Sequence, residues 1–271
     1  MLNAIILGLV QGLTEFLPIS SSAHLVIMQA ILPGFSEPAM EFDVMLHAGT
    51  LVAVFAYYRR DIAALLSGLF GRSSGVDAIT PEGARWFVLA IVIGSIPAGI
   101  AGLLWEDKLE AVFSAPKAAA AFLCVTAAIL SAGELIANRI QRAPSPFSKS
   151  SVLRWVIVGV MQAVALLPGI SRSGSTIAAG LGVGWKREDA ARVSFFLMMP
   201  AVGGAVALKL GDLMAAGAHV DWVAMSVGSV VAGISGYTAI WLLIRYIRTH
   251  RLYPFAVYCL LVGVGYLLLG S

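Results

Sequence analysis

Long apolar runs dominate the chain and are separated by short polar stretches. A helix needs about 20 residues to cross the hydrocarbon of a bilayer, and five runs reach this length fully or marginally. These runs are Phe42–Tyr58, Trp86–Trp105, Ala118–Ala137, Trp222–Ile244 and Leu252–Leu269. A sixth run, Val193–Leu208, is slightly short but extends back through residues 189–192. The pattern predicts six membrane-spanning helices.

Four further apolar pieces are too short to cross a bilayer, because about 13 or 14 residues make only roughly 20 Å of helix. They are grouped in pairs around Pro18 and Pro168. The pieces are Leu2–Thr14, Ser20–Leu32, Trp155–Leu167 and Ser171–Gly184. Each pair predicts a re-entrant hairpin, in which one half-helix enters the membrane, the chain turns, and another half-helix leaves. Such irregular backbone requires surrounding protein or a polar cavity. We call the pairs the first and the second hairpin.

The composition agrees with a membrane protein. Hydrophobic residues make up 59% of the 271 residues and charged residues only 12%, whereas about 25% charge is typical of a soluble domain. The first 14 residues lack a basic segment and a small-residue cleavage site, so no cleaved signal peptide is expected. Basic cytoplasmic loops explain the net charge of +3 better than a nucleic-acid partner does. We therefore expect an all-α polytopic membrane protein that binds no nucleic acid.

The distribution of Lys and Arg predicts the orientation of the chain. If the loops after Tyr58, Ala137 and Ile244 and the ends of the second hairpin face the cytoplasm, that side holds 14 of the 18 basic residues. The outer side then holds Lys108, Lys117 and Lys209. Cytoplasmic loops carry an excess of Lys and Arg, so both termini are expected outside. Glu134, near the inner end of its span, is expected to pair with a loop arginine.

The two halves of the chain resemble each other at an offset of 151 residues. The matching pairs are Gly8 with Gly159, Gln11 with Gln162, Ile19 with Ile170, Ser20 with Ser171, Ser22 with Ser173, and Leu46 with Leu197. Each half contains one hairpin and three spans, and because three is odd the second half enters from the opposite face. The sequence thus predicts two inverted-topology repeats, about 1–138 and 152–271, joined by a cytoplasmic linker, 139–151. Sites of such proteins lie at the repeat interface, so the two hairpin tips should meet.

An arginine lies at the turn of the second hairpin, within the stretch Pro168–Thr176. A charge at membrane depth is costly and usually marks a functional site. Hydroxyl groups at a helix start, the helix N-terminus itself and a planar guanidinium together favour an anion, above all phosphate. The residues expected to bind phosphate are Ser20, Ser22, Ser171, Arg172, Ser173 and Thr176.

The first hairpin adds groups that anion binding alone does not need. Gln11 and Glu15 are four residues apart and share one face of the first half-helix. His24 lies one turn into the second half-helix, within reach of Ser20 or Ser21. A carboxylate and a histidine beside an anion site offer a base, an acid or a metal ligand.

Structural roles are the alternatives for several of these residues. Serines after a proline often serve only as helix caps, and Glu15 is also a candidate partner for the buried charge of Arg172. His24 is alternatively an interior residue held by hydrogen bonds. Asp43 and His47 share a face of one span, where they either line the cavity or form a hydrogen bond between packed helices.

Two sequence signatures coincide with the hairpin turns. Residues 11–15, Gln-Gly-Leu-Thr-Glu, fit the pattern (E/Q)xxxE and are followed by the serine cluster and His24. Residues 168–176 fit PGxSRSxxT at every fixed position. Both resemble the signatures of the undecaprenyl-diphosphate phosphatases of bacterial membranes, the BacA or UppP type, and the resemblance extends over nearly the whole chain. Gln11 is the variant of the first position that lacks a negative charge.

The resemblance implies hydrolysis of undecaprenyl diphosphate to the monophosphate, which recycles the lipid carrier of cell-wall synthesis. It also implies a divalent cation, Mg²⁺ or Ca²⁺, and resistance to bacitracin on overexpression. Glu15 with Gln11 would hold this cation, or Glu15 would act as a base. The expected location is the bacterial cytoplasmic membrane, with the site open to the outer, periplasmic face. A homodimer is compatible with the family. The residues expected to be catalytic are Glu15, Ser21, His24 and Arg172.

Two questions stay open at the level of sequence. The nucleophile is either Ser21, with His24 beside it as in the family's proposed arrangement, or a water molecule activated by His24 or Glu15, since both routes need the same groups. The alternative to an enzyme is a transporter or flippase of a phosphorylated lipid or anion, because inverted repeats with paired hairpins are a transporter architecture.

Overall fold

A computed structural model of the protein describes residues 1–32, 39–72, 79–113, 115–149, 151–215 and 221–270. The described residues form the helices α1 (Leu2–Phe16), α2 (Ser21–Ile31), α3 (Ala39–Tyr57), α4 (Arg59–Leu69), α5 (Pro81–Phe113), α6 (Pro116–Ala137), α7 (Val152–Val164), α8 (Arg172–Gly182), α9 (Arg187–Ala215), α10 (Trp222–Ile247) and α11 (Tyr253–Leu269). The expectation of an all-α protein is confirmed for these residues.

The length and apolarity of the helices agree with a polytopic membrane protein. Within the described residues, four helices are long and apolar enough to cross a membrane: Pro81–Trp105, Pro116–Ala137, Arg187–Lys209 and Trp222–Ile247. They match four of the six predicted spans. The other two predicted spans correspond to shorter apolar helices, Phe42–Tyr57 in α3 and Tyr253–Leu269 in α11.

Both hairpins form as pairs of short helices around the predicted turns. The first hairpin consists of α1 and α2, and the second of α7 and α8; the two helices of each pair pack against each other. The helix ends differ slightly from the predicted bounds: α1 ends at Phe16 instead of Thr14, and α7 ends at Val164 instead of Leu167. Pro18 and Pro168 both lie in the turns, where a proline cannot break a helical hydrogen bond.

The short helix α4 was not predicted, because the sequence suggested a loop after Tyr58. Buried Ala64, Leu65 and Gly68 form its inner face. This face packs on α5, where a Cβ added at Gly68 would lie only 2.5 Å from the Ala84 Cβ. The glycine therefore permits the close approach that holds α4 in place.

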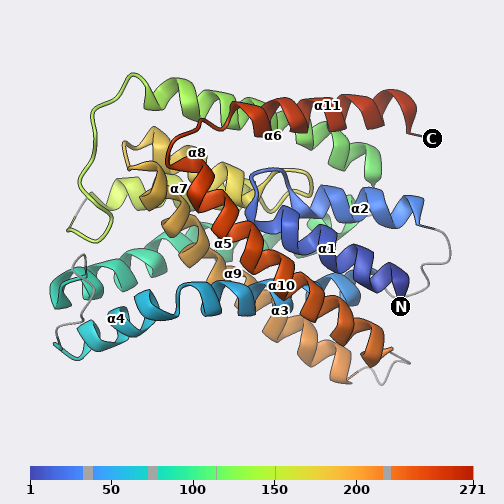
Figure 1. The fold of residues 1–271 in the computed structure, drawn as a ribbon, viewed down its shortest axis with the longest axis horizontal. Coiled ribbons are helices and arrows are strands. Elements are labelled where there is room, and N and C mark those ends of the chain that lie inside the picture. Colours follow the sequence, from blue (N-terminus) through green and yellow to red (C-terminus); the bar gives the residue numbers. More distant parts are fainter. Residues whose placement is uncertain (33–38, 73–78, 114, 150, 216–220, 271) are drawn as a thin grey trace.

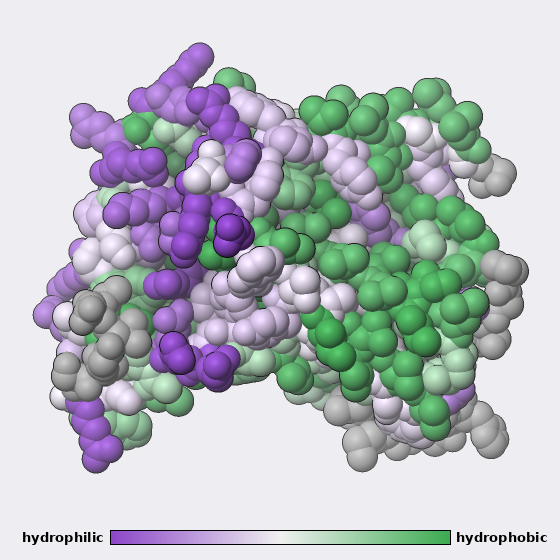
Figure 2. Space-filling model, viewed as in Figure 1, coloured by the Kyte–Doolittle hydropathy of each residue, from purple (hydrophilic) through white to green (hydrophobic). Residues whose placement is uncertain are grey.

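The helices place the chain ends at one end of the molecule, and the end of α4, the start of α5 and residues 138–149 at the other (Figure 1). Hydrophilic residues gather at the end with the end of α4 and residues 138–149, and apolar residues cover much of the remaining surface on the face shown (Figure 2). Near this hydrophilic end, buried Glu134 accepts hydrogen bonds from both Nη atoms of Arg187, each 2.6 Å long. The predicted pairing of Glu134 with an arginine is confirmed, although Arg187 begins α9 instead of lying in a loop.

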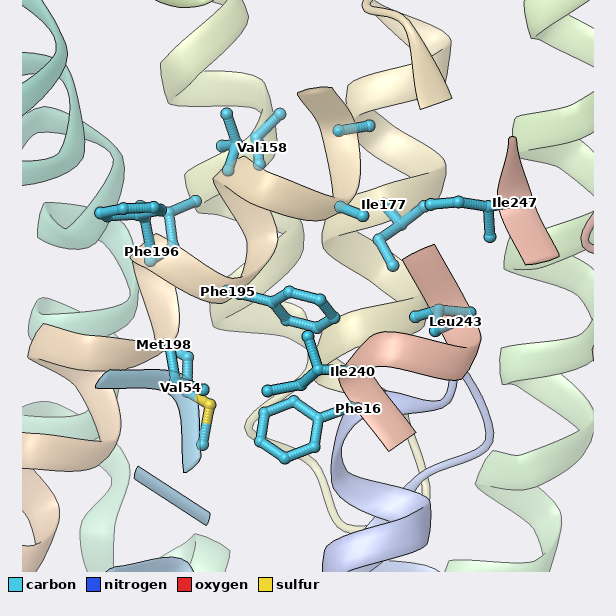
Figure 3. Close-up of a cluster of buried hydrophobic side chains, with 14 of the residues drawn as sticks. Phe16, Val54, Val158, Ile177, Phe195, Phe196, Met198, Ile240, Leu243 and Ile247 are labelled. Carbon is cyan, nitrogen blue, oxygen red and sulfur yellow. The ribbon is translucent and has the colours of Figure 1, made fainter. Parts of the chain in front are cut away.

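A buried apolar cluster joins helices from both halves of the chain. Figure 3 shows Phe16 of α1, Val54 of α3, Ile177 of α8, Phe195 of α9 and Ile240 of α10 in this cluster. The rings of Phe16 and Phe195 meet edge to face with centroids 5.4 Å apart, an arrangement that contributes roughly 0.5–1.5 kcal/mol beyond burial. Because Phe16 is fully buried, it fixes the end of α1, and with it the neighbouring Glu15.

Candidate functional site

A serine caps the second helix of each hairpin. The Ser20 hydroxyl accepts from the Ala23 amide at the start of α2, and the Ser171 hydroxyl accepts from the Gly174 amide at the start of α8. Among the described residues, Ser20 is the one non-glycine residue with a positive φ, 68°. Backbone of this kind is costly and tends to cluster at functional sites. The capping role expected for serines after a proline is thus confirmed for these two.

The tips of the two hairpins are joined by reciprocal hydrogen bonds. The Ser22 hydroxyl accepts from the Gly169 amide at 3.2 Å, and the Ser173 hydroxyl donates to the Leu17 carbonyl at 3.0 Å. Gly169 has φ +105°, and a Cβ there would lie 2.3 Å from the Ala119 carbonyl oxygen, so only glycine fits this turn. The predicted meeting of the tips is confirmed.

The carboxylate of Glu15 is the centre of the polar cluster between the tips. Its Oε1 accepts from Arg172 Nη2 at 2.6 Å, while its Oε2 accepts from Ser21 Oγ at 2.5 Å and from Gln11 Nε2 at 3.1 Å. Glu15 is buried, and one carboxylate therefore links an arginine of the second hairpin to a serine of the first. The pairing of Glu15 with Arg172 was one of the alternatives drawn from the sequence, and it is present.

Arg172 is held by α9 as well as by Glu15. Its Nη1 donates to the Ser194 carbonyl at 3.2 Å. Thr176 supports this arrangement from behind, because its hydroxyl bonds the Arg172 carbonyl at 2.8 Å and the Ser194 hydroxyl at 2.7 Å. The side chain of Arg172 nevertheless remains 15% exposed and faces a cavity.

The cavity beside Glu15 has a volume of about 550 Å³. Six of the predicted site residues line it: Glu15, Ser20, Ser21, Ser22, Ser171 and Arg172. The rest of its wall is largely apolar and includes Leu25, Val26, Val44, Ala201, Val202, Ala205 and Val206, with Lys209 on α9. Such a cavity suits an amphiphile, with an anionic group at the tips and an apolar chain along α2, α3 and α9.

Four predicted site residues do not line this cavity: Gln11, His24, Ser173 and Thr176. Gln11 supports Glu15, Ser173 ties the tips together, and Thr176 supports Arg172. They contribute to the site by holding other groups.

His24 points away from the Ser21 hydroxyl. Its Nδ1 lies 2.7 Å from the Ser20 carbonyl and its Nε2 lies 2.8 Å from the Tyr258 hydroxyl, and the two rings are stacked. The predicted reach of His24 to Ser20 is confirmed, but the contact is to the backbone. A neutral imidazole has one donor and one acceptor nitrogen, and these two partners satisfy both.

A second histidine occupies the place beside Glu15. His47 Nε2 lies 3.5 Å from Glu15 Oε2, the oxygen that accepts from Ser21. Its Nδ1 lies 2.8 Å from the Asp43 carbonyl. Both His47 and Asp43 line the cavity. The Asp43 carboxylate also accepts from Gln29 Nε2 of α2 at 2.7 Å, so both alternatives drawn from the sequence for this pair are present. The sequence signal was their shared helix face, but it did not reveal the partner of His47.

The Gln11–Glu15 pair as folded does not fit a resident divalent cation. Mg²⁺ and Ca²⁺ prefer oxygen ligands, but both oxygens of Glu15 already accept from protein donors, and Gln11 turns its NH₂ toward Glu15 Oε2. Within the described residues, no group of three His, Cys, Asp or Glu side chains could hold a metal ion. A cation at Glu15 would therefore require these hydrogen bonds to be exchanged.

The sequence of the whole chain matches known proteins. It is 41% identical to an undecaprenyl-diphosphatase of Geobacter metallireducens, with 98% of this chain and 97% of the relative covered. Undecaprenyl-diphosphatases of Methanosphaera stadtmanae and Idiomarina loihiensis are 41% and 38% identical, with 97% of this chain and 95% and 96% of the relatives covered. The family model described as bacitracin resistance protein BacA matches residues 4–265, and the chain belongs to this family.

Proposed function

We propose that the protein is a membrane phosphatase that hydrolyses undecaprenyl diphosphate to undecaprenyl phosphate and inorganic phosphate, recycling the lipid carrier of peptidoglycan synthesis. The observation that carries this function is the Ser21–Glu15–Arg172 cluster at the polar end of a largely apolar cavity. A diphosphate fits the cluster and a prenyl chain fits the apolar wall. Three relatives that are about 40% identical bear the name of this activity.

Ser21 is the nucleophile in the mechanism that we propose. Its hydroxyl donates to Glu15 Oε2 at 2.5 Å, so the carboxylate is placed to take the proton as the oxygen attacks the terminal phosphorus. Undecaprenyl phosphate leaves, and water then hydrolyses the phosphoserine. In the competing route, Glu15 or His24 activates a water molecule directly. His24 is poorly placed for this role, because its two ring nitrogens are already hydrogen-bonded to the Ser20 carbonyl and the Tyr258 hydroxyl.

Arg172 binds the diphosphate and stabilises the charge on the transferring phosphoryl group. Phosphoryl transfer depends mainly on positioning and electrostatic stabilisation. The guanidinium lines the cavity at the start of α8, where the helix N-terminus adds its own attraction for an anion. Ser20, Ser22 and Ser171 line the same region and supply hydroxyls to the phosphate oxygens.

The two histidines have different supporting roles. His47 keeps the Glu15 carboxylate turned toward Ser21, since its Nε2 adjoins the same oxygen. His24 holds the tip of the first hairpin by bridging the Ser20 carbonyl and Tyr258. Because Ser20 has the strained backbone of the turn, this bridge fixes the position of the neighbouring nucleophile.

A divalent cation, Mg²⁺ or Ca²⁺, remains a prediction that rests on the family resemblance. The donors around Glu15 argue against a resident ion at Gln11 and Glu15, and the mechanism above takes no step through one.

The inverted repeats and re-entrant hairpins are part of the same proposal. The packing of α1 on α10 corresponds to that of α7 on α5, and the packing of α3 on α10 corresponds to that of α9 on α5. In each case a helix of one half packs on a helix of the other half, and the two halves do so in the same way. Two inverted repeats, 1–138 and 152–271 with the linker 139–151, would produce this correspondence. The cavity would then open to the outer, periplasmic face of the bacterial cytoplasmic membrane, with both termini on that side. A homodimer is compatible with this arrangement.

The decisive experiment uses the purified protein in detergent with undecaprenyl diphosphate. Release of inorganic phosphate is expected in wild type and is lost in Ser21→Ala. A transient phospho-enzyme in rapid-quench samples of wild type, absent from Ser21→Ala, would support the serine route, whereas full turnover by that variant would exclude it. No phosphate release under any cation condition would instead favour the transporter.

A further inference from the structure

A buried amide on the cavity wall has no partner. Gln162 of α7 lines the cavity beside Ser171 and Arg172, and only 1% of its surface is exposed. Neither its Nε2 nor its Oε1 has a hydrogen-bond partner among the described residues. Nearly all buried polar groups in folded proteins are paired, because leaving one unpaired is destabilising. An unpaired amide at a cavity wall thus indicates a group that a bound ligand satisfies.

The corresponding glutamine of the first hairpin shows why this amide is unpaired. Gln11 lies 151 positions earlier and donates to the Glu15 carboxylate one helical turn away, at 3.1 Å. The residue one turn after Gln162 is Leu166, which offers no side-chain acceptor. The second hairpin therefore keeps the amide but lacks its internal acceptor.

The chemistry around Gln162 points to an anionic oxygen as the missing acceptor. Arg172 and the α8 N-terminus make this part of the cavity favourable for an anion. An amide NH₂ is an uncharged donor that adds a directed hydrogen bond without changing the charge of the site. We propose that Gln162 Nε2 binds a phosphoryl oxygen of the prenyl diphosphate, as a substrate-binding residue outside both sequence signatures. The proposal rests on the function proposed above.

Thermal stability gives the first test, independent of turnover. In Gln162→Leu the unpaired amide is replaced by an apolar group of similar size, so the melting temperature without ligand should stay equal to wild type or rise. A short-chain prenyl methylenebisphosphonate, whose P–C–P bridge is not hydrolysed, should raise the melting temperature of wild type and do so much less in Gln162→Leu. Gln162→Met, of similar length, provides a second variant if the first fails to fold.

Kinetics give the second test. In both variants the KM for a prenyl diphosphate should rise by about tenfold or more, the usual effect of a lost hydrogen bond to a charged group, while kcat changes less. Met161→Leu is the matched control, because Met161 is the half-buried neighbour on α7 and does not line the cavity. Its KM should equal that of wild type.

Three outcomes would overturn the inference. A melting temperature well below wild type in both ligand-free variants would assign Gln162 a structural role. An unchanged KM and an unchanged response to the bisphosphonate would mean that trapped water satisfies the amide. Weaker inhibition by inorganic phosphate with an unchanged KM would place the released product there instead of the substrate. Failure of the proposed function is distinguishable, because wild type would then release no phosphate while the bisphosphonate arm still reports on Gln162.

Discussion

The two hairpins share a scaffold but differ in the groups that they present. Both begin their second helix with a serine cap. In both, the hydroxyl oxygen of the capping serine is hydrogen-bonded to the hydroxyl oxygen of the serine two positions later: Ser20 with Ser22 at 3.1 Å, and Ser171 with Ser173 at 3.2 Å. At an offset of 151 residues, however, Ser21 corresponds to Arg172 and Glu15 to Leu166. The matching positions build the turns, whereas the differing ones carry the proposed nucleophile, the carboxylate and the guanidinium. In the proposed function, the two similar turns supply two helix starts that attract an anion, and the residues that differ between them supply the chemistry.

The largest effect is expected from the groups found only in the first hairpin. Ser21→Ala should lower kcat by about 10³-fold or more, because among the described residues Ser21 is the hydroxyl that donates to Glu15. Glu15→Gln should lower kcat by about 10²–10⁴-fold. Phosphate release from undecaprenyl diphosphate measures both. Ser131→Ala is the control, since the Ser131 hydroxyl donates within its own helix to the Ala127 carbonyl and Ser131 does not line the cavity. Activity of Ser21→Ala near that of Ser131→Ala would assign the attack to water.

The second-largest effect on activity is expected from Arg172, whose guanidinium has no counterpart at the matching position of the first hairpin. Arg172→Lys keeps the charge but cannot bond Glu15, the Ser194 carbonyl and a phosphate in the same planar geometry. We expect kcat/KM to fall by about 10²–10³-fold, as for loss of a donor to the transition-state charge. Near-normal phosphate release in this variant would show that only the charge matters, and that Arg172 does not clamp the diphosphate.

The sequence predicted the hairpins and their meeting because these features depend on local signals. Runs too short to span, each pair separated by a proline, define the half-helices, and the repeated serines define the caps. The helix α4 escaped prediction because its inner face consists of a few small and apolar residues, visible as a face only when α5 lies against it.

The hydrogen-bond partners of the two histidines could not be predicted from local sequence signals. His24 was expected beside Ser20 or Ser21, but its Nε2 forms a hydrogen bond with the hydroxyl of Tyr258, which lies 234 residues later. His47 reaches Glu15 because α3 packs beside α1, and no motif spacing encodes that contact. Helix-face spacing identified both residues as polar groups of the membrane interior, whereas their partners depend on tertiary packing.

Substitutions of the two histidines should have smaller effects, on kcat for His47 and on the melting temperature for His24. His47→Gln removes the neighbour of Glu15 Oε2 and should lower kcat by about tenfold without lowering the melting temperature. His24→Gln breaks the bridge between Ser20 and Tyr258 and should lower the melting temperature by a few degrees. Tyr258→Phe should reproduce the His24→Gln shift. The reverse pattern, with kcat lost only in His24→Gln, would restore His24 as the proton carrier.

The reciprocal bonds between the tips should have equal and modest effects. Ser22→Ala and Ser173→Ala each remove one cross-hairpin hydrogen bond, worth about 1 kcal/mol. Both should lower the melting temperature by roughly 2–4 °C. Their KM values should differ, because Ser22 lines the cavity and Ser173 does not. A raised KM in Ser173→Ala with no thermal shift would mean that Ser173 binds phosphate, as the sequence first indicated.

The smallest effect concerns the cation. Because protein donors already occupy both oxygens of Glu15, Mg²⁺ or Ca²⁺ should not change the melting temperature of the substrate-free protein. Gln11→Glu places a second carboxylate beside the first, and repulsion between them should create a cation-dependent stabilisation that wild type lacks. Gln11→Met is the uncharged control and should show none. A clear rise in the wild-type melting temperature with either ion would instead mean that a cation displaces these donors before substrate arrives.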